Sequence, residues 1–194
     1  MRMASYQQTL RRLQPIVPIL FDSLQSGLTM SREDHERKKI KRTGDPHFFA
    51  HTVRRETCEK LRAKGLLVTD PEEERSALAR SSIQVQHNGV LLWVFRSQDG
   101  QIPLPVSPLK QRYYRQEPTL EGWDNLILLW ADDDAVLRDP MHLIRPLGGD
   151  HRRASLRTDW SGPLARRMAN MRVEDLNVLQ PEHQSAKLEG DGPS

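Results

Sequence analysis

Cysteine is almost absent from this sequence, which has only Cys58 among its 194 residues. A single thiol cannot form an intramolecular disulfide, and it cannot supply a zinc site made of several cysteines. A chain that relies on no disulfide suits a reducing compartment, so we expect a cytoplasmic location.

Long apolar stretches are also lacking. The longest runs, Val90–Phe95 and Leu126–Ala131, contain six residues each, whereas a helix needs roughly 20 apolar residues to cross a bilayer. We therefore expect no membrane span and no membrane partner. The segment before Asp22 lacks acidic side chains, as organelle-targeting peptides do, but its apolar positions continue into a predicted core helix.

Several enzyme signatures are missing. The G-x-x-x-x-G-K-[ST] loop does not occur, which excludes a P-loop NTPase, and Ser161 belongs to no G-x-S-x-G nucleophile elbow. His47 is followed by Phe48, so the glutamate that acts as general base in a zinc-protease helix is missing. The sequence therefore lacks the signatures of these three enzyme classes.

The composition that remains is that of a folded domain with a modest core, with 37% hydrophobic and 28% charged residues. We predict one α+β domain over residues 1–180, helical over 1–80, sheet-rich over 82–147, with a short helix over 163–179 and a flexible tail over 181–194. The expected architecture is a helical N-terminal half packed on a small, mainly antiparallel sheet of four to five strands.

The first helix is predicted over residues 5–25, where apolar positions follow a helical period. We expect Pro15 and Pro18 to kink this helix and Gly27 to end it. Residues 31–42 are charged almost throughout, so they form either an exposed helix capped by Ser31 or a mobile loop.

The clearest local signals predict a helix over residues 46–64. Asp45 is a good N-cap, Pro46 suits the first helical position, and Gly65 suits a left-handed C-cap. A further short helix is expected from Asp70 to about Arg80, because its first turn is acidic.

Strand-like patterns begin after residue 82. Ile83–Gln86 and Val90–Phe95 flank an Asn-Gly pair that suits a type I′ hairpin turn. The chain is expected to return as an edge strand over residues 101–106, limited by its prolines. Two later strands are predicted over Asn125–Ala131, which should be central, and over Met141–Leu147.

Charge is distributed unevenly, although the net charge is only +3. Residues 32–64 hold eleven Lys and Arg against six Asp and Glu, and residues 145–167 hold six Arg against two Asp. Acidic clusters at Glu72–Glu74 and Asp132–Asp134 lie between them. Such polarity favours an anionic partner, of which nucleic acid is the commonest, although a solvated surface without a partner gives the same pattern.

The leading hypothesis is a small intracellular nucleic-acid-associated protein that contacts phosphates through a basic N-terminal helical surface. A second patch combines Lys110, Arg112 and Arg115 with two tyrosines, whose rings could stack on bases or simply pack. The residues assigned to nucleic-acid binding are Arg37, Lys38, Lys39, Lys41, Arg42, Arg54, Arg55, Arg112, Tyr113, Arg152 and Arg153.

The first alternative is a small enzyme that acts on a phosphorylated or nucleotide substrate. His47 and His51 lie four residues apart on one helical face, which lets both imidazoles reach one phosphate, metal ion or reacting group. Either histidine would then serve as the acid–base, with Arg54 or Arg55 as an oxyanion clamp. The structural alternative is that both histidines only flank the core.

No cofactor or metal site is assigned. A metal held by the two histidines would need a third ligand, for which the candidates are His35, Asp45, Cys58 or a remote carboxylate. Asp132–Asp134 follows an apolar strand, as magnesium-binding carboxylates often do, but an acidic turn explains the same pattern.

The second alternative is a partner-binding module of a two-protein system. In this hypothesis the charged segment 31–44 orders against an acidic protein partner. A homodimer organised by the sheet is also compatible with the sequence.

Overall fold

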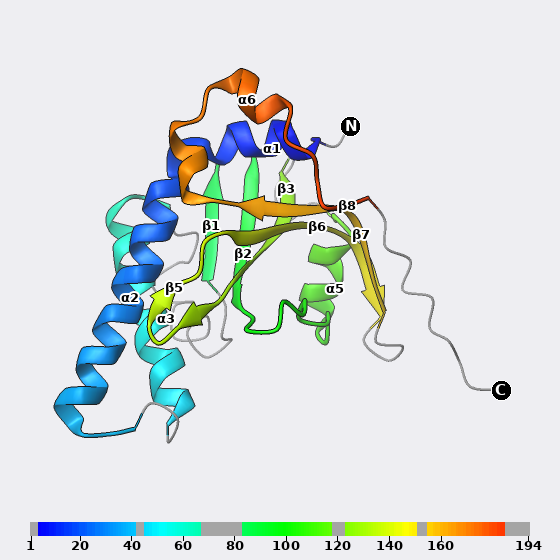
Figure 1. The fold of residues 1–194 in the computed structure, drawn as a ribbon. Helices are drawn as coiled ribbons and strands as arrows, with labels where there is room; N and C mark the ends of the chain where they lie inside the picture. The colour runs from blue at the N-terminus through cyan, green and yellow to red at the C-terminus, as the bar shows by residue number, and fades with distance from the viewer. Residues whose placement is uncertain (1–3, 42–44, 67–82, 118–122, 151–154, 185–194) are drawn as a thin grey trace.

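A computed structural model describes residues 4–41, 45–66, 83–117, 123–150 and 155–184. Most of its described helical residues come first along the chain and the strands follow, with two short α-helices in the later part of the chain (Figure 1). The α-helices are α1 (Tyr6–Leu13), α2 (Val17–Lys38), α3 (Pro46–Ala63), α5 (Pro108–Tyr114) and α6 (Val173–Asn177). The strands are β1 (Ile83–His87), β2 (Val90–Arg96), β3 (Asp124–Trp130), β4 (Asp132–Asp133), β5 (Val136–Leu137), β6 (Met141–Asp150), β7 (Ser155–Leu164) and β8 (His183–Gln184).

Two helices replace the one that was expected over residues 5–25. A 3-10 turn, Gln14–Ile16, separates α1 from α2, and it contains Pro15, which has no backbone N–H to donate. Ser5 caps α1 with a reciprocal pair of hydrogen bonds to Gln8. The expected proline interruption is therefore present, but it divides the helix rather than kinking it.

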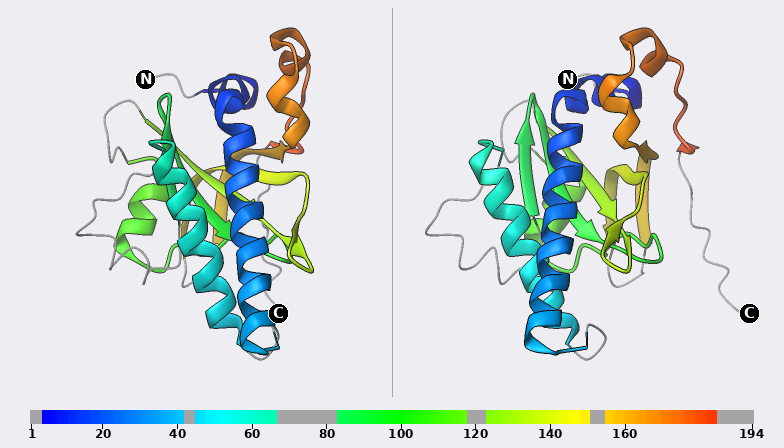
Figure 2. Two further views of the ribbon diagram at one scale, coloured as in Figure 1. Left: turned by 90° about the vertical axis from the view of Figure 1, so that its left-hand side faces the viewer. Right: turned by 60° about the vertical axis from the view of Figure 1, so that its left-hand side comes forward.

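The expectation that Gly27 ends the helix is wrong, because α2 continues through it to Lys38. Gly27 lies where α2 packs against α3, and the two helices run side by side (Figure 2). A Cβ atom at Gly27 would lie 2.6 Å from both Thr57 Oγ1 and the Val53 carbonyl oxygen. Glycine is thus required by the close helix contact. Ser31 is likewise a buried residue inside α2 and not an N-cap.

Helix α3 confirms the prediction made from its capping residues. The Asp45 side chain accepts a hydrogen bond of 2.8 Å from the backbone N–H of Phe48, and Gly65 has a φ of +68°. The helix expected from Asp70 to Arg80 lies outside the described residues.

The sheet has the strand order β1-β2-β3-β6-β7-β8, with β2 and β3 parallel and every other neighbouring pair antiparallel. The fold class is therefore α+β with a mainly antiparallel sheet, as expected. The hairpin between β1 and β2 is confirmed, because Asn88 and Gly89 both have positive φ, as a type I′ turn requires. A separate two-stranded ribbon is formed by β4 and β5.

Two expectations for the later chain are wrong. Residues 101–106 form a loop and not a strand, because prolines remove ladder donors and Tyr114 Oη instead donates to the Pro103 carbonyl at 2.5 Å. The helix expected over 163–179 is replaced by the end of β7, a 3-10 turn (Arg166–Asn170) and the short α6.

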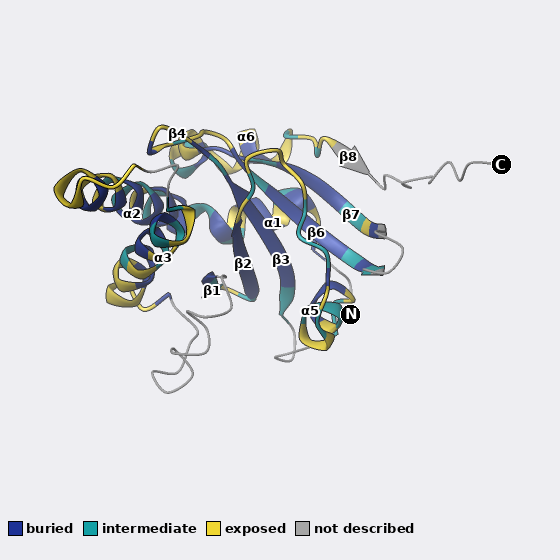
Figure 3. Ribbon diagram, turned by 90° about the horizontal axis from the view of Figure 1, so that it is seen from below, coloured by how far each residue is buried: buried dark blue, intermediate teal, exposed yellow. Residues whose placement is uncertain are grey.

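Helices cover both faces of the sheet. Alternate residues of β2 point to opposite sides: Leu92 and Val94 pack in the cluster formed with α1, α2 and α3, whereas Trp93 and Phe95 pack in the cluster formed with α5. Figure 3 shows the buried strands between exposed outer surfaces of α2 and α3 and those of α5. In the described part of the chain, no helix has the length and apolarity needed to cross a bilayer.

Candidate functional site

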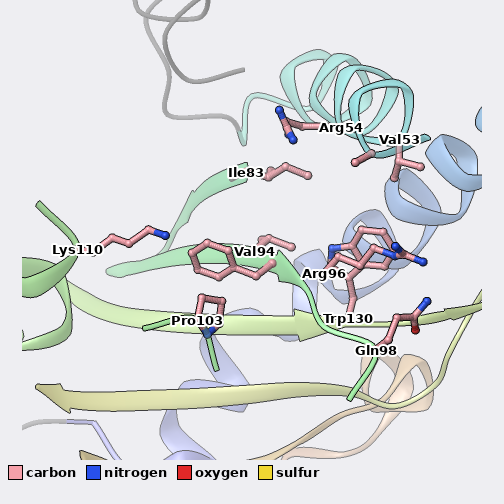
Figure 4. A pocket seen from close by; sticks show the side chains of 11 residues that line it. Val53, Arg54, Ile83, Val94, Arg96, Gln98, Pro103, Lys110 and Trp130 are labelled. Carbon is pink, nitrogen blue, oxygen red and sulfur yellow. The ribbon is translucent and has the colours of Figure 1, made fainter. Parts of the chain in front are cut away.

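A cavity of about 410 Å³ lies between α3, the ends of β2 and β3, and the loop that leads into α5 (Figure 4). We call it the crevice. Its described lining residues are Ala50, Val53, Arg54, Ile83, Val94, Phe95, Arg96, Gln98, Pro103, Lys110 and Trp130.

The topology explains why the cavity forms here. Strands β2 and β3 are parallel and in register, with Arg96 opposite Trp130, so both carboxyl ends reach the same edge of the sheet. The chain crosses from β2 to β3 through α5, which covers one face, while α3 covers the other. Ligands in open sheets commonly bind beyond the carboxyl ends of parallel strands.

Two cations enter the crevice from its opposite sides. Arg54 comes from α3 and Lys110 from α5, with Ile83 and Val94 on the floor near them (Figure 4). Burial lowers the pKa of Lys110. Burial is also the main cause of the lowered pKa of Arg54, and the electrostatic interaction with Cys58 opposes it by raising that pKa. Both cations therefore carry their charge in a partly desolvated setting.

Arg96 is the third cation at the crevice, and a buried carboxylate neutralises it. Arg96 Nε and Nη2 lie 2.9 and 2.8 Å from Asp132 Oδ1. The Gln98 amide nitrogen donates to the same carboxylate at 3.1 Å, and its oxygen accepts from the Asp132 backbone N–H at 3.3 Å. These bonds fix one wall of the crevice.

This arrangement is incompatible with a magnesium site at Asp132–Asp134. Asp132 is buried against Arg96 and Gln98, whereas Asp133 is exposed and forms an ion pair of 2.6 Å with Arg138. The Arg138 hydrogen bond lowers the pKa of Asp133. Within the residues that the structure describes, no group of three His, Cys, Asp or Glu side chains is arranged to hold a metal ion.

Aromatic rings accompany the cations. The Arg96 guanidinium carbon lies 4.7 Å from the Phe49 ring centroid and 5.9 Å from that of Trp130. Lys110 Nζ lies 5.2 Å from the Phe95 ring centroid. The crevice therefore combines positive charge with apolar and aromatic walls, and its described lining contains no Asp or Glu.

The two histidines and the basic run lie elsewhere, at the end of the α2–α3 helix pair. Lys38, Lys39, Lys41, His47 and His51 are exposed there, and we call these five residues the basic hairpin end. None of them lines the crevice. Of the helix residues assigned to phosphate contact or oxyanion binding, only Arg54 lines the crevice.

Acidic neighbours neutralise part of the basic surface that the sequence predicts. Arg37 forms an ion pair with Asp34. Arg55 pairs with Glu56 at 2.7 Å, and the hydrogen bond to Glu56 raises the pKa of Arg55. The charge that remains at the basic hairpin end comes mainly from its lysines.

The second predicted patch does not present its tyrosine. Tyr113 is 2% exposed, and its hydroxyl is held between β2 and β3 by the backbone of Leu91 and Leu126. Its expected role in stacking on a base is therefore wrong, because its ring is packed in the core. Arg112 is exposed and pairs with Glu117 at 3.0 Å. Arg42, Arg152 and Arg153 lie outside the described residues.

Sequence reasoning missed Arg96 and Trp130 and assigned Lys110 only to a surface patch. Arg96 ends an otherwise apolar strand, and a charged residue in that position was the one sequence feature that could have indicated it. Its convergence with Lys110 and Arg54 depends on the parallel pairing of β2 with β3, which no local pattern predicts.

Comparisons with protein-family models, with curated proteins and with solved structures found no significant match to this chain.

Proposed function

We propose that this protein is a nucleic-acid-associated binding protein that contacts phosphates through the basic hairpin end. The observation that carries the proposal is the exposure of Lys38, Lys39 and Lys41 together where α2 ends and α3 begins. Lysines that neutralise backbone phosphates release counterions from the nucleic acid, which favours binding without specifying a sequence.

The shape of this region supports the proposal. The lower ends of α2 and α3 extend beyond the sheet, so the basic hairpin end projects from the body of the protein (Figure 1). Lys39 has a left-handed φ of 53°, which ends α2 and separates Lys41 from the helix. Lys38 Nζ lies 4.1 Å from the Phe48 ring centroid, which holds this cation over the start of α3.

The histidines are assigned to phosphate contact in this proposal. An acid–base histidine belongs in a concave site with a group that orients its ring, whereas His47 and His51 are exposed on α3 and outside the crevice lining. Exposed imidazoles beside lysines can instead donate hydrogen bonds to phosphate oxygens.

The test is a binding titration with labelled single-stranded DNA, duplex DNA and RNA at salt concentrations between about 50 and 200 mM. The variant Lys39→Gln/Lys41→Gln removes two charges from the basic hairpin end. The matched control, Lys60→Gln/Lys64→Gln, removes two exposed charges from the other end of α3.

For duplex DNA we expect the slope of log affinity against log salt to fall by about 0.9 for each lost phosphate contact, and so by about 1.8 in the hairpin variant. The control should keep the parent slope. Absence of low-salt binding to all three nucleic acids, or equal losses in both variants, overturns the proposal. A stoichiometric acidic protein partner with no nucleic-acid binding would favour the partner-module alternative instead.

A further inference from the structure

The crevice is a second site, separate from the basic hairpin end, and its chemistry points to a small ligand. We propose that it binds a phosphate ester that carries a planar ring and has the size of a nucleoside monophosphate. The proposal does not depend on nucleic-acid binding, because none of the five residues of the basic hairpin end lines this cavity.

The charge of the crevice favours an anion. Arg54 and Lys110 enter from different helices, and the described lining contains no Asp or Glu. In the described part of the chain Lys110 has no carboxylate partner, and the contacts of its ammonium group are the rings of Trp93 and Phe95. A concave, partly desolvated site whose described lining presents cationic side chains concentrates an anionic ligand.

A phosphate monoester fits two cations that approach from opposite sides. It offers three terminal oxygen atoms, so one oxygen can accept from the Arg54 guanidinium while another accepts from the Lys110 ammonium. Arginine suits a planar, forked contact with phosphate and lysine acts as a point charge, so the pair supplies both kinds of interaction.

The walls fit a ring. Ile83, Val94 and Pro103 provide apolar surface, and Phe95 and Trp130 provide aromatic surface. Arg96 lies against the same aromatic wall, and Asp132 already balances its charge, so we assign the anion contacts to Arg54 and Lys110.

The size of the crevice limits the ligand. Its volume of about 410 Å³ lies near the lower end of the range of roughly 300–1,000 Å³ for small-molecule sites. This space suits one ring and one phosphate group better than a dinucleotide. An oligonucleotide could enter only through a terminal phosphorylated nucleotide.

The experiment titrates the full chain separately with four nucleoside 5′-monophosphates, the matching nucleosides, inorganic phosphate and a 5′-phosphorylated oligonucleotide. Binding is followed by calorimetry and by NMR of the Trp130 indole N–H and the Ile83 methyl groups, which line the crevice. The variants are Arg54→Gln and Lys110→Gln, and the matched control is Lys60→Gln, a neutralisation on the exposed part of α3.

We expect at least one nucleoside monophosphate to shift the Trp130 and Ile83 resonances of the parent protein. Each crevice variant should weaken its binding at least about tenfold, whereas Lys60→Gln and Lys39→Gln/Lys41→Gln should leave it unchanged. The nucleoside and inorganic phosphate should each bind at least about tenfold more weakly than the monophosphate, because each lacks one half of the recognised group.

Three results overturn the proposal. The first is that no nucleoside monophosphate shifts the crevice resonances, a measurement on the parent protein that does not depend on the folding of a variant. The second is that inorganic phosphate binds as tightly as the monophosphates, which would mean that the ring is not recognised. The third is that only the phosphorylated oligonucleotide binds and that the hairpin variant abolishes this binding, which would assign the phosphate contacts to the basic hairpin end.

Discussion

Arg96 and Asp132 join the end of β2 to the start of β4, with two guanidinium nitrogens within 2.9 Å of one carboxylate oxygen. The Asp132 side chain is 0% exposed and that of Arg96 is 34% exposed. The buried carboxylate therefore depends on Arg96 for charge compensation. The same contact holds Arg96 against the aromatic wall of the crevice.

Replacing Arg96 with Met should destabilise the fold by about 3–5 kcal/mol, because the substitution leaves the Asp132 charge buried without its partner. The double variant Arg96→Met/Asp132→Asn should be less destabilised than Arg96→Met, because the uncompensated charge is gone. Urea unfolding measures both. Arg112→Gln, which breaks an exposed ion pair with Glu117 away from Asp132, is the control and should leave the unfolding midpoint unchanged. A double variant less stable than Arg96→Met would contradict this account.

Gly27→Ala should destabilise the α2–α3 pair, although alanine is the better helix former by about 1 kcal/mol. The new Cβ would meet the Val53 carbonyl oxygen and Thr57 Oγ1 at 2.6 Å, and backbone cannot move aside as a side-chain tip can. We expect a net loss of about 1–3 kcal/mol in the free energy of unfolding, measured by urea denaturation. Glu33→Ala on the exposed side of α2 is the control, and a stabilised Gly27→Ala variant would disprove the close contact.

Gly27 also shows where sequence reasoning succeeds and where it stops. Asp45 and Gly65 act through bonds and dihedral angles close to them in the chain, so the bounds of α3 could be predicted from them. Gly27 has the same residue type as a helix stop, but its role depends on contacts with Val53 and Thr57 of α3, which lie 26 and 30 residues later in the chain. A local pattern cannot separate these two uses of glycine.

The candidate site was also predictable only in part, because local patterns do not show which distant elements come together. Arg54 was identified as a cation close to His47 and His51 on a helix with clear capping residues, but Lys110 and Arg96 belong to different elements. They converge because β2 pairs in parallel with β3 and the intervening chain crosses over as α5. The exposed lysines near residue 40 needed no tertiary information, since a run of charges with Ile40 as its only large aliphatic residue cannot form a core face.

Tyr113→Phe distinguishes a core tyrosine from a base-stacking one. The Tyr113 hydroxyl accepts from the Leu126 N–H at 3.0 Å and lies 2.6 Å from the Leu91 carbonyl oxygen, so it bridges β2 and β3. Its removal leaves buried backbone groups unsatisfied and should cost about 1–3 kcal/mol in thermal or urea unfolding. Nucleic-acid affinity of the folded variant should equal that of the parent, and a selective loss of affinity without a loss of stability would restore the stacking role.

Lys110 should titrate at lower pH than an unperturbed lysine side chain, because burial lowers its pKa. NMR of the lysine Cε and Nζ groups can follow Lys110 beside Lys60, which is exposed on α3. Between the lowered folded pKa and the ordinary unfolded value, the unfolded chain binds more protons at this site than the folded chain does. Stability therefore rises with pH across that window.

Lys110→Met removes this titration, so the parent should gain stability relative to the variant as the pH rises through the same window. Below the folded pKa, the parent carries the full cost of a partly buried ammonium group, which an anion in the crevice would offset. Saturation with a nucleoside monophosphate should accordingly move the Lys110 titration to higher pH. If Lys110 titrates at the ordinary pKa of a lysine, or if the stability difference falls with rising pH, the ammonium group is solvated and the crevice does not hold it in a desolvated state.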